Sequence, residues 1–205
     1  MRVLFVRHGE TSWNLEGRYQ GRADVALCET GHESARSIGR RMRGEKIALL
    51  LSSPLRRAES TAAEISKALG GIPAALDLRL TEIDFGAWQG LTQQEIKMRW
   101  PEELRSWKRR PEEFRFPGGE SLREVHERID EFLRHPPWSY YSGSGDVIVV
   151  SHAGPIRLAG LIADRRQLRE FREQSVRPGE IQEFEWCAAF GLHRVSGRDT
   201  AKESS

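Results

Sequence analysis

Short apolar runs alternate with helical patterns along most of the chain. Three continuous apolar runs, each typical of a strand buried on both faces of a parallel sheet, cover residues 3–6, 47–51 and 147–150. Three further segments, with apolar side chains at the spacing of one helix face, cover residues 55–69, 122–132 and 156–163. Strands that alternate with helices predict an α/β fold with a mostly parallel sheet, and residues 180–188 and 190–195 predict a hairpin.

Three segments interrupt this alternation. Residues 92–117 combine tryptophan, proline and clustered charges, which predicts a short helical insertion. Residues 135–145 are rich in proline, glycine and serine and predict a surface loop. Residues 197–205 are almost free of apolar side chains and predict a flexible tail. The length of 205 residues then fits a single domain over residues 1–196.

Composition narrows the class of protein. The chain has 32 Lys and Arg against 30 Asp and Glu, a net charge of +2 that gives no general attraction to nucleic acid or anionic lipid. No apolar run approaches the roughly 18 residues that a membrane helix needs, and residues 3–6 are too short for a signal peptide. Two cysteines exclude a disulfide framework. We therefore expect a cytoplasmic protein with no membrane or nucleic-acid partner.

Histidines follow two of the predicted strands. His8 comes after the first strand and His152 after the last parallel one, while a serine-rich segment ending in Arg56 follows the strand over residues 47–51. In open α/β sheets, ligands bind beyond the carboxyl ends of the strands, where helix N-termini also point. Two imidazoles with Arg7 and Arg56 would suit a dianionic tetrahedral group, because guanidinium forks match phosphate oxygens. A metal is not expected, since Arg7 beside His8 disfavours a cation and no HExxH motif occurs.

A series of short motifs follows in order over residues 2–165. They are 7–14 (RHGETSWN), 21–31 with its two glycines, 52–58 (SSPLRRA), 80–90 (LTEIDFGAWQG), 117–121 (PGGES) and 151–154 (SHAG). Together they resemble the histidine phosphatase superfamily in its cofactor-dependent phosphoglycerate mutase-like branch. The resemblance implies a three-layer α/β sandwich with helices on both faces of the sheet.

The resemblance also implies three catalytic residues. His8 would be the nucleophile that forms a phosphohistidine, with its attacking nitrogen unprotonated and the other held by a backbone carbonyl. Glu82 would protonate the leaving oxygen and then activate water. His152 would stabilise the transferring phosphoryl group.

Phosphate binding would involve arginine, amide and backbone groups. By the resemblance these are Arg7, Arg56, Asn14, and the backbone N–H groups of Ala153 and Gly154. The register of the family motif favours Arg56 over the neighbouring Arg57. Residues that would shape substrate specificity are Gln20, Gly21, Arg109 and Arg110.

Three functions remain open at this point. The motifs 80–90 and 117–121 resemble broad-specificity and α-ribazole phosphatases, which favours a phosphomonoesterase acting on a small phosphate ester without a cofactor. The alternative is a phosphoglycerate mutase, which would need 2,3-bisphosphoglycerate and cations for the substrate carboxylate; Lys108, Arg109 and Arg110 could supply them. A non-catalytic phospho-ligand binding protein is disfavoured because His8, Glu82 and His152 are all present. Dimers are common among members of the family it resembles, so a homodimer is one expected assembly.

Overall fold

A mixed sheet runs through the part of the chain that the computed structural model describes, residues 1–141 and 145–194. Its strand order is β3-β2-β4-β1-β5-β6. β1 pairs in parallel with β4, β4 with β2, and β2 with β3, whereas β5 and β6 add an antiparallel hairpin at one edge. The strands are β1 (Arg2–Arg7), β2 (Ile47–Ser52), β3 (Ala74–Leu76), β4 (Asp146–Ser151), β5 (Ile181–Cys187) and β6 (Gly191–Arg194).

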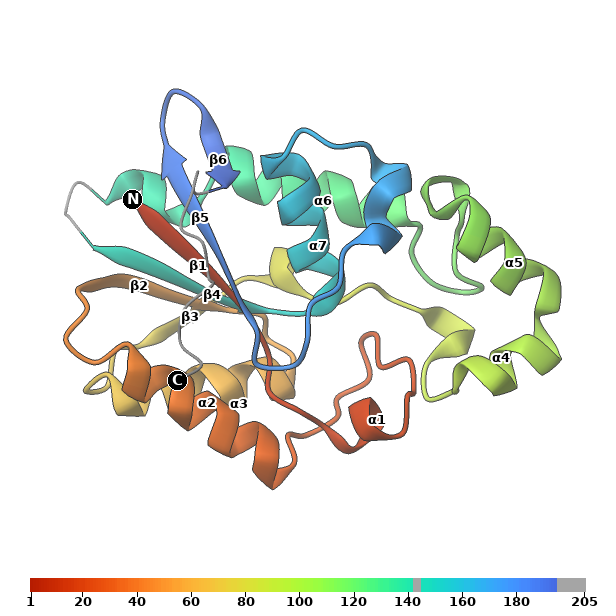
Figure 1. The fold of residues 1–205 in the computed structure, drawn as a ribbon, viewed down its shortest axis with the longest axis horizontal. Coiled ribbons are helices and arrows are strands. Elements are labelled where there is room, and N and C mark those ends of the chain that lie inside the picture. Colours follow the sequence, from red (N-terminus) through yellow and green to blue (C-terminus); the bar gives the residue numbers. More distant parts are fainter. Residues whose placement is uncertain (142–144, 195–205) are drawn as a thin grey trace, which may run out of the picture.

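Helices cover both faces of the sheet, so the predicted three-layer architecture is confirmed (Figure 1). α2 and α3 lie on one face and α6 and α7 on the other, while α4 and α5 lie off the end of the sheet. The helices are α1 (Ser12–Leu15), α2 (Glu29–Arg41), α3 (Arg56–Ala68), α4 (Gln93–Arg99), α5 (Pro101–Arg109), α6 (Leu122–Arg134) and α7 (Ala153–Ala163). Short 3-10 helices are η1 (Leu78–Leu80), η2 (Gly86–Trp88), η3 (Pro111–Glu113), η4 (Pro137–Tyr140) and η5 (Leu168–Glu173).

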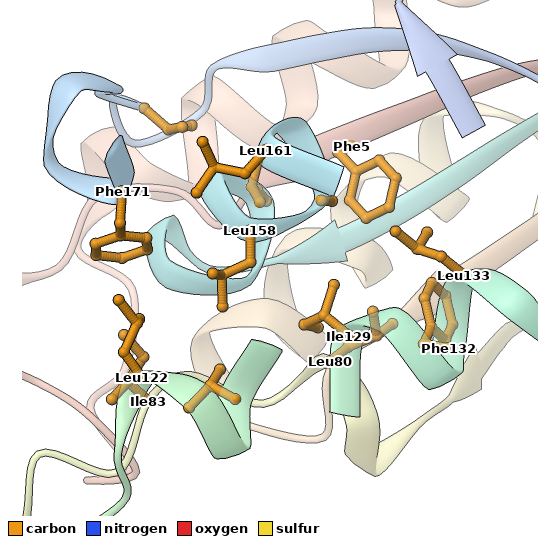
Figure 2. Packing of buried hydrophobic residues seen from close by; sticks show 14 of the residues in the cluster. Phe5, Leu80, Ile83, Leu122, Ile129, Phe132, Leu133, Leu158, Leu161 and Phe171 are labelled. Carbon is orange, nitrogen blue, oxygen red and sulfur yellow. The ribbon is translucent and has the colours of Figure 1, made fainter. Parts of the chain in front are cut away.

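The alternation of side chains along β1 builds two separate cores. Val3 and Phe5 pack with residues of α6 and α7, and Leu4 and Val6 pack with residues of α2 and α3. All four are almost fully buried, which explains why the strand reads as a continuous apolar run. Figure 2 shows the larger core, where Leu158 and Leu161 of α7 and Ile129, Phe132 and Leu133 of α6 gather with Phe5 of β1.

One of the interrupting segments agrees with its sequence-based description, and two other parts of the chain differ from theirs. Residues 92–117 do form short helices, α4, α5 and η3, as expected. Residues 135–145 are only partly a surface loop, because Trp138 in η4 is fully buried and lies 5.4 Å from the Phe132 ring, centroid to centroid. The short strand β3 was not predicted, since a three-residue edge strand leaves almost no periodic signal.

The tail expected at residues 197–205 lies outside the described residues. Within the described part of the chain, no helix has the length and apolar character needed to cross a membrane.

A glycine contact fixes the loop that follows β1. Gly31 in the first turn of α2 lies so close to this loop that an added Cβ would collide with the backbone of Glu10. An added Cβ on Gly9 would likewise collide with the Gly31 carbonyl. The contact is backbone against backbone, so a larger residue cannot be accommodated by a side-chain rotation.

Replacing Gly31 is therefore expected to destabilise the fold. Gly31→Ala forces the helix and the loop apart, and overpacking of this kind costs about 1–3 kcal/mol. Urea denaturation should show a lower free energy of unfolding, with Ser37→Ala on the same helix as the control. An unchanged unfolding midpoint in Gly31→Ala would contradict this account of the contact.

Candidate active site

His8 lies immediately beyond the end of β1 and is 2% exposed. Its backbone N–H donates to the carbonyl of Ser151 at 2.9 Å, which ties the ends of β1 and β4 together. Its Nδ1 lies 2.7 Å from the Gly9 carbonyl oxygen. A carbonyl can only accept, so Nδ1 carries the proton and Nε2 is the unprotonated nitrogen with its electron pair. The predicted backbone contact of this ring is thus present.

Arg57, and not Arg56, is the arginine beside His8, so the predicted register of this motif is wrong. Arg57 is fully buried, and its Nε donates to His8 Nε2 at 3.2 Å. Its two terminal nitrogens donate to the carbonyls of Ala23 at 2.8 Å and Gly21 at 2.7 Å. The Arg56 side chain is exposed, and its backbone N–H donates to Asp24 Oδ1 at 2.9 Å at the start of α3.

Helix geometry explains this correction. The buried face of α3 contains Thr61 and Ile65, and Arg57 lies one and two turns before them on the same face. Arg56 points about 100° away from that stripe, because each helical residue turns by this angle.

His152 occupies the N-cap position of α7, and its ring lies 5.0 Å from the His8 ring, centroid to centroid. Its Nε2 is 2.8 Å from Ser53 Oγ, and that hydroxyl already accepts the Leu55 backbone N–H at 3.3 Å. Ser53 can give its hydroxyl proton to His152 Nε2, and in the tautomer that accepts it the imidazole proton is on Nδ1. Nδ1 is buried without a partner among the described residues, so it is free to donate to a ligand.

The electrostatic environment keeps both imidazoles neutral. Burial is the main cause that lowers the pKa of His8 and of His152 well below the usual value, with Arg57 next and Arg7 adding to it. Burial also lowers the pKa of Arg7, and it lowers the pKa of Arg57 to about 10. The cluster concentrates positive charge around a neutral nucleophile, which is the condition that an anionic ligand would relieve.

Glu82 is the carboxylate of this site and is 7% exposed. Its Oε1 accepts the backbone N–H groups of Ile83 at 2.9 Å and Gly154 at 3.1 Å. Arg128 holds the loop from behind, donating to the carbonyls of Arg79 at 2.8 Å and Thr81 at 2.7 Å. The amide of Gly154, which was predicted to bind phosphate, therefore positions Glu82 instead.

A cavity of about 350 Å³ opens over these groups. Asn14 lines it with its amide oxygen already accepting from Thr11, so the amide NH2 is the group left for a ligand. The lining residues are Arg7, His8, Asn14, Gly17, Arg18, Tyr19, Gln20, Gly21, Arg57, Glu82, Ile83, Phe85, Trp107, Ala153, Gly154, Arg157, Phe171 and Arg172.

The predicted specificity residues divide into two groups. Gln20 and Gly21 line the cavity as expected. Arg109 and Arg110 do not: both are exposed, and Arg110 pairs with Glu113 at 2.9 Å on the outer surface. They point outward because the apolar face of α5, Leu104 and Trp107, turns toward the core.

Sequence reasoning missed the outer wall of the cavity. Tyr19, Trp107 and Phe171 are its aromatic residues, and Arg157 and Arg172 are its cations. Arg157 comes three residues after the SHAG motif on α7 and one turn beyond Ala153, a spacing that could have indicated it. No local signal identifies the residues on η5.

Among the residues that the structure describes, no group of three or more His, Cys, Asp or Glu side chains is arranged to hold a metal ion.

Comparison with known proteins gives one family. The family model for the histidine phosphatase superfamily (branch 1) matches residues 3–190. Phosphoserine phosphatase 1 of Hydrogenobacter thermophilus is 36% identical over 157 residues, covering 77% of this chain and 73% of the relative. A 2,3-bisphosphoglycerate-dependent phosphoglycerate mutase of Mesorhizobium japonicum is 31% identical over 172 residues, covering 82% of this chain and 84% of the relative.

A solved structure agrees with the fold. The α-ribazole phosphatase from Shigella flexneri superimposes with a TM-score of 0.82 at 25% sequence identity, and the match covers 95% of each chain. Similar proteins thus include both phosphatases and mutases.

The two neighbouring arginines provide a matched test of the site. Arg57→Ala removes the guanidinium beside His8, and losing one donor to the transferring group typically lowers the rate by about 10²–10³. Arg56→Ala removes only an exposed side chain, so its kcat/KM for an aryl phosphate is expected to stay within about twofold of the unmodified enzyme.

Loss of activity through unfolding must be distinguished from loss of the catalytic contact in this test. Arg57→Lys keeps a buried charge without the planar fork and is expected to fold but to lose affinity for orthovanadate. Thermal melts of all three variants control for stability. Equal activity losses in the Arg56 and Arg57 variants would contradict the assignment.

Proposed function

Since the chain belongs to the histidine phosphatase superfamily and is a phosphatase of that superfamily, we propose that it hydrolyses a small phosphate monoester through phospho-His8. One observation carries the proposal: a neutral His8 whose Nδ1 is held by the Gly9 carbonyl and whose Nε2 faces buried arginine. This is the state that a nitrogen nucleophile needs.

In the first step His8 Nε2 attacks phosphorus in line with the leaving oxygen. The bond from Nε2 to phosphorus forms as the bond from phosphorus to the ester oxygen breaks. Glu82 in its protonated form gives its proton to that oxygen, so the alcohol departs neutral. The Gly9 carbonyl stabilises the positive charge that the imidazole gains, through its hydrogen bond to Nδ1.

In the second step water attacks phospho-His8 along the same line. Glu82, now a carboxylate, takes the water proton, and the electron pair of the breaking bond returns to Nε2. Inorganic phosphate leaves, and the next substrate enters with Glu82 again protonated. The two steps replace one difficult displacement with two easier ones.

Three kinds of donor stabilise the phosphoryl oxygens during both steps. Arg7 and Arg57 supply guanidinium groups, His152 supplies its unpartnered Nδ1–H, and Asn14 supplies its amide NH2. Ala153 lines the cavity at the first turn of α7, where backbone N–H groups favour anions. We propose that these donors replace a metal and that no cofactor is needed.

The mutase alternative rests on the relative from Mesorhizobium japonicum, and it would require 2,3-bisphosphoglycerate. Its main support in the sequence was the cluster of Lys108, Arg109 and Arg110. All three are exposed and outside the cavity, which favours hydrolysis. We further propose a cytoplasmic enzyme without a nucleic-acid partner, and a homodimer, which sedimentation or size-exclusion measurements can test.

Removing the nucleophile is expected to abolish turnover. His8→Ala should lower kcat for an aryl phosphate by more than about 10³-fold, because a displacement without the nucleophile loses the covalent route. His135→Ala, an exposed histidine, is the control. EDTA should leave the kcat of the unmodified enzyme unchanged. Activity that EDTA removes and a divalent metal restores would contradict the proposal.

The role of Glu82 depends on the leaving group. Glu82→Gln keeps an oxygen for the N–H groups of Ile83 and Gly154 but removes the transferable proton. General acid–base assistance is worth about 10²–10⁴ in rate, so an alkyl phosphate should lose this factor. For an aryl phosphate, the rate of the burst of phenol release should fall much less, because a phenolate leaves without a proton.

Asp84 offers a matched control in the same loop. Its Oδ1 accepts the Gly86 backbone N–H at 2.9 Å, and it does not line the cavity. Asp84→Asn is expected to change neither rate substantially. Equal burst losses for alkyl and aryl esters in Glu82→Gln would show that Glu82 is not the acid, and Asp84 would be tested next.

A further inference from the structure

Two arginines on the outer wall of the cavity are not used by the mechanism above. Arg157 projects from α7 and Arg172 from η5, and both line the cavity. Neither forms an ion pair with a carboxylate within the described part of the chain. Arg18 on the same cavity is different, because it pairs with Glu16 at 2.6 Å and with Glu95 at 3.3 Å.

Aromatic rings hold both guanidinium groups in place. The Arg157 guanidinium carbon lies 5.4 Å from the centroid of the Phe171 ring, and that of Arg172 lies 5.9 Å from the Trp107 ring. The two rings are themselves in contact, with centroids 5.9 Å apart, and both residues are buried. Stacking on a packed aromatic pair restricts the arginines, so less rotamer freedom is lost when they bind a ligand.

The charge on this wall is not balanced by the protein. Arg157 Nε is buried without a hydrogen-bond partner in the described residues. Burial lowers the pKa of Arg157, Glu82 opposes that effect, and Arg172 lowers the pKa further. Glu82 is the one carboxylate among the described residues that line the cavity, whereas four arginines without an ion pair in the described part of the chain line it, namely Arg7, Arg57, Arg157 and Arg172. A ligand anion would therefore relieve the repulsion between the two arginines.

Arg157 also lies close enough to the reacting groups for one small molecule to span both. Glu82, His8 and Arg157 line the same cavity, together with Arg7 and Arg57. A cavity of about 350 Å³ is at the small end of the usual range for ligand sites, roughly 300–1,000 Å³. The leaving group is thus expected to place its far end against Arg157 and Arg172.

We propose that Arg157 and Arg172 form a second anion-binding subsite, so that the substrate is a small phosphate monoester carrying a further anionic group on its leaving group. This inference rests on the proposed phosphatase function and adds the substrate class. A carboxylate and a second phosphate share the required chemistry, since both accept from guanidinium forks.

Two matched pairs of substrates test the subsite. 3-Phosphoglycerate differs from glycerol 3-phosphate by a carboxylate in place of a hydroxymethyl group. Propane-1,3-diol bisphosphate differs from its monophosphate by the second phosphate. Release of inorganic phosphate is measured for all four. In at least one pair, kcat/KM is expected to be on the order of tenfold to 100-fold higher for the member with the additional anionic group, the factor that hydrogen bonds to a charged group typically contribute. The pair with the larger ratio identifies the anion.

Variants assign that preference to the two arginines. Arg157→Met and Arg172→Met keep much of the apolar stem and remove the charge, so each is expected to shrink the ratio within the preferred pair. Arg157→Lys should restore part of it. Arg169→Met on η5 removes an exposed arginine outside the cavity and is expected to leave every ratio unchanged.

The outcomes separate this inference from the proposed function. Hydrolysis of p-nitrophenyl phosphate with equal kcat/KM within both pairs would overturn the subsite and leave the phosphatase intact. So would a preference that persists in both methionine variants. No hydrolysis of any of these esters, p-nitrophenyl phosphate included, by the folded protein would instead overturn the proposed function.

Discussion

The hydrogen bond between His8 Nδ1 and the Gly9 carbonyl determines the chemistry of the site, because it leaves the electron pair on Nε2. The rest of the structure serves to hold both partners. Gly9 donates its N–H to Thr61 Oγ1 at 3.0 Å, and Thr61 lies one turn after Arg57 on α3. One face of one helix therefore fixes the loop that carries the nucleophile and also places the guanidinium beside it.

That arrangement brings buried positive charges together, and backbone carbonyls accept from several of the guanidinium donors. Carbonyls of Gly21 and Ala23 accept from Arg57, and the carbonyl of Val176 accepts from Arg7 at 2.6 Å. Carbonyls stabilise the arginines without neutralising them, so their charge stays available to a phosphoryl group. A carboxylate in the same positions would have competed with the substrate.

The sequence pattern predicted those strands and helices whose apolar side chains repeat at a regular spacing. The buried strands before His8 and His152 and the helix after His152 follow from apolar spacing, and the paired strands bring the two imidazoles to one edge of the sheet. Helix geometry could also have selected Arg57 over Arg56, because Ile65 and Thr61 define the buried stripe of α3. The wall formed by Arg172 and Trp107 depends instead on how η5 packs against α5, a long-range contact that no local pattern specifies.

The central claim is that His8 is the nucleophile and that it reacts through Nε2. Rapid quenching during turnover, followed by peptide mapping and phosphorus–nitrogen NMR of the denatured protein, tests this most directly. The account predicts an acid-labile, base-stable phosphate on His8, attached at Nε2, that disappears when substrate is exhausted. Phosphate attached at Nδ1 or to another residue, or steady turnover with no trapped phosphoenzyme under conditions that make its hydrolysis rate-limiting, would contradict it.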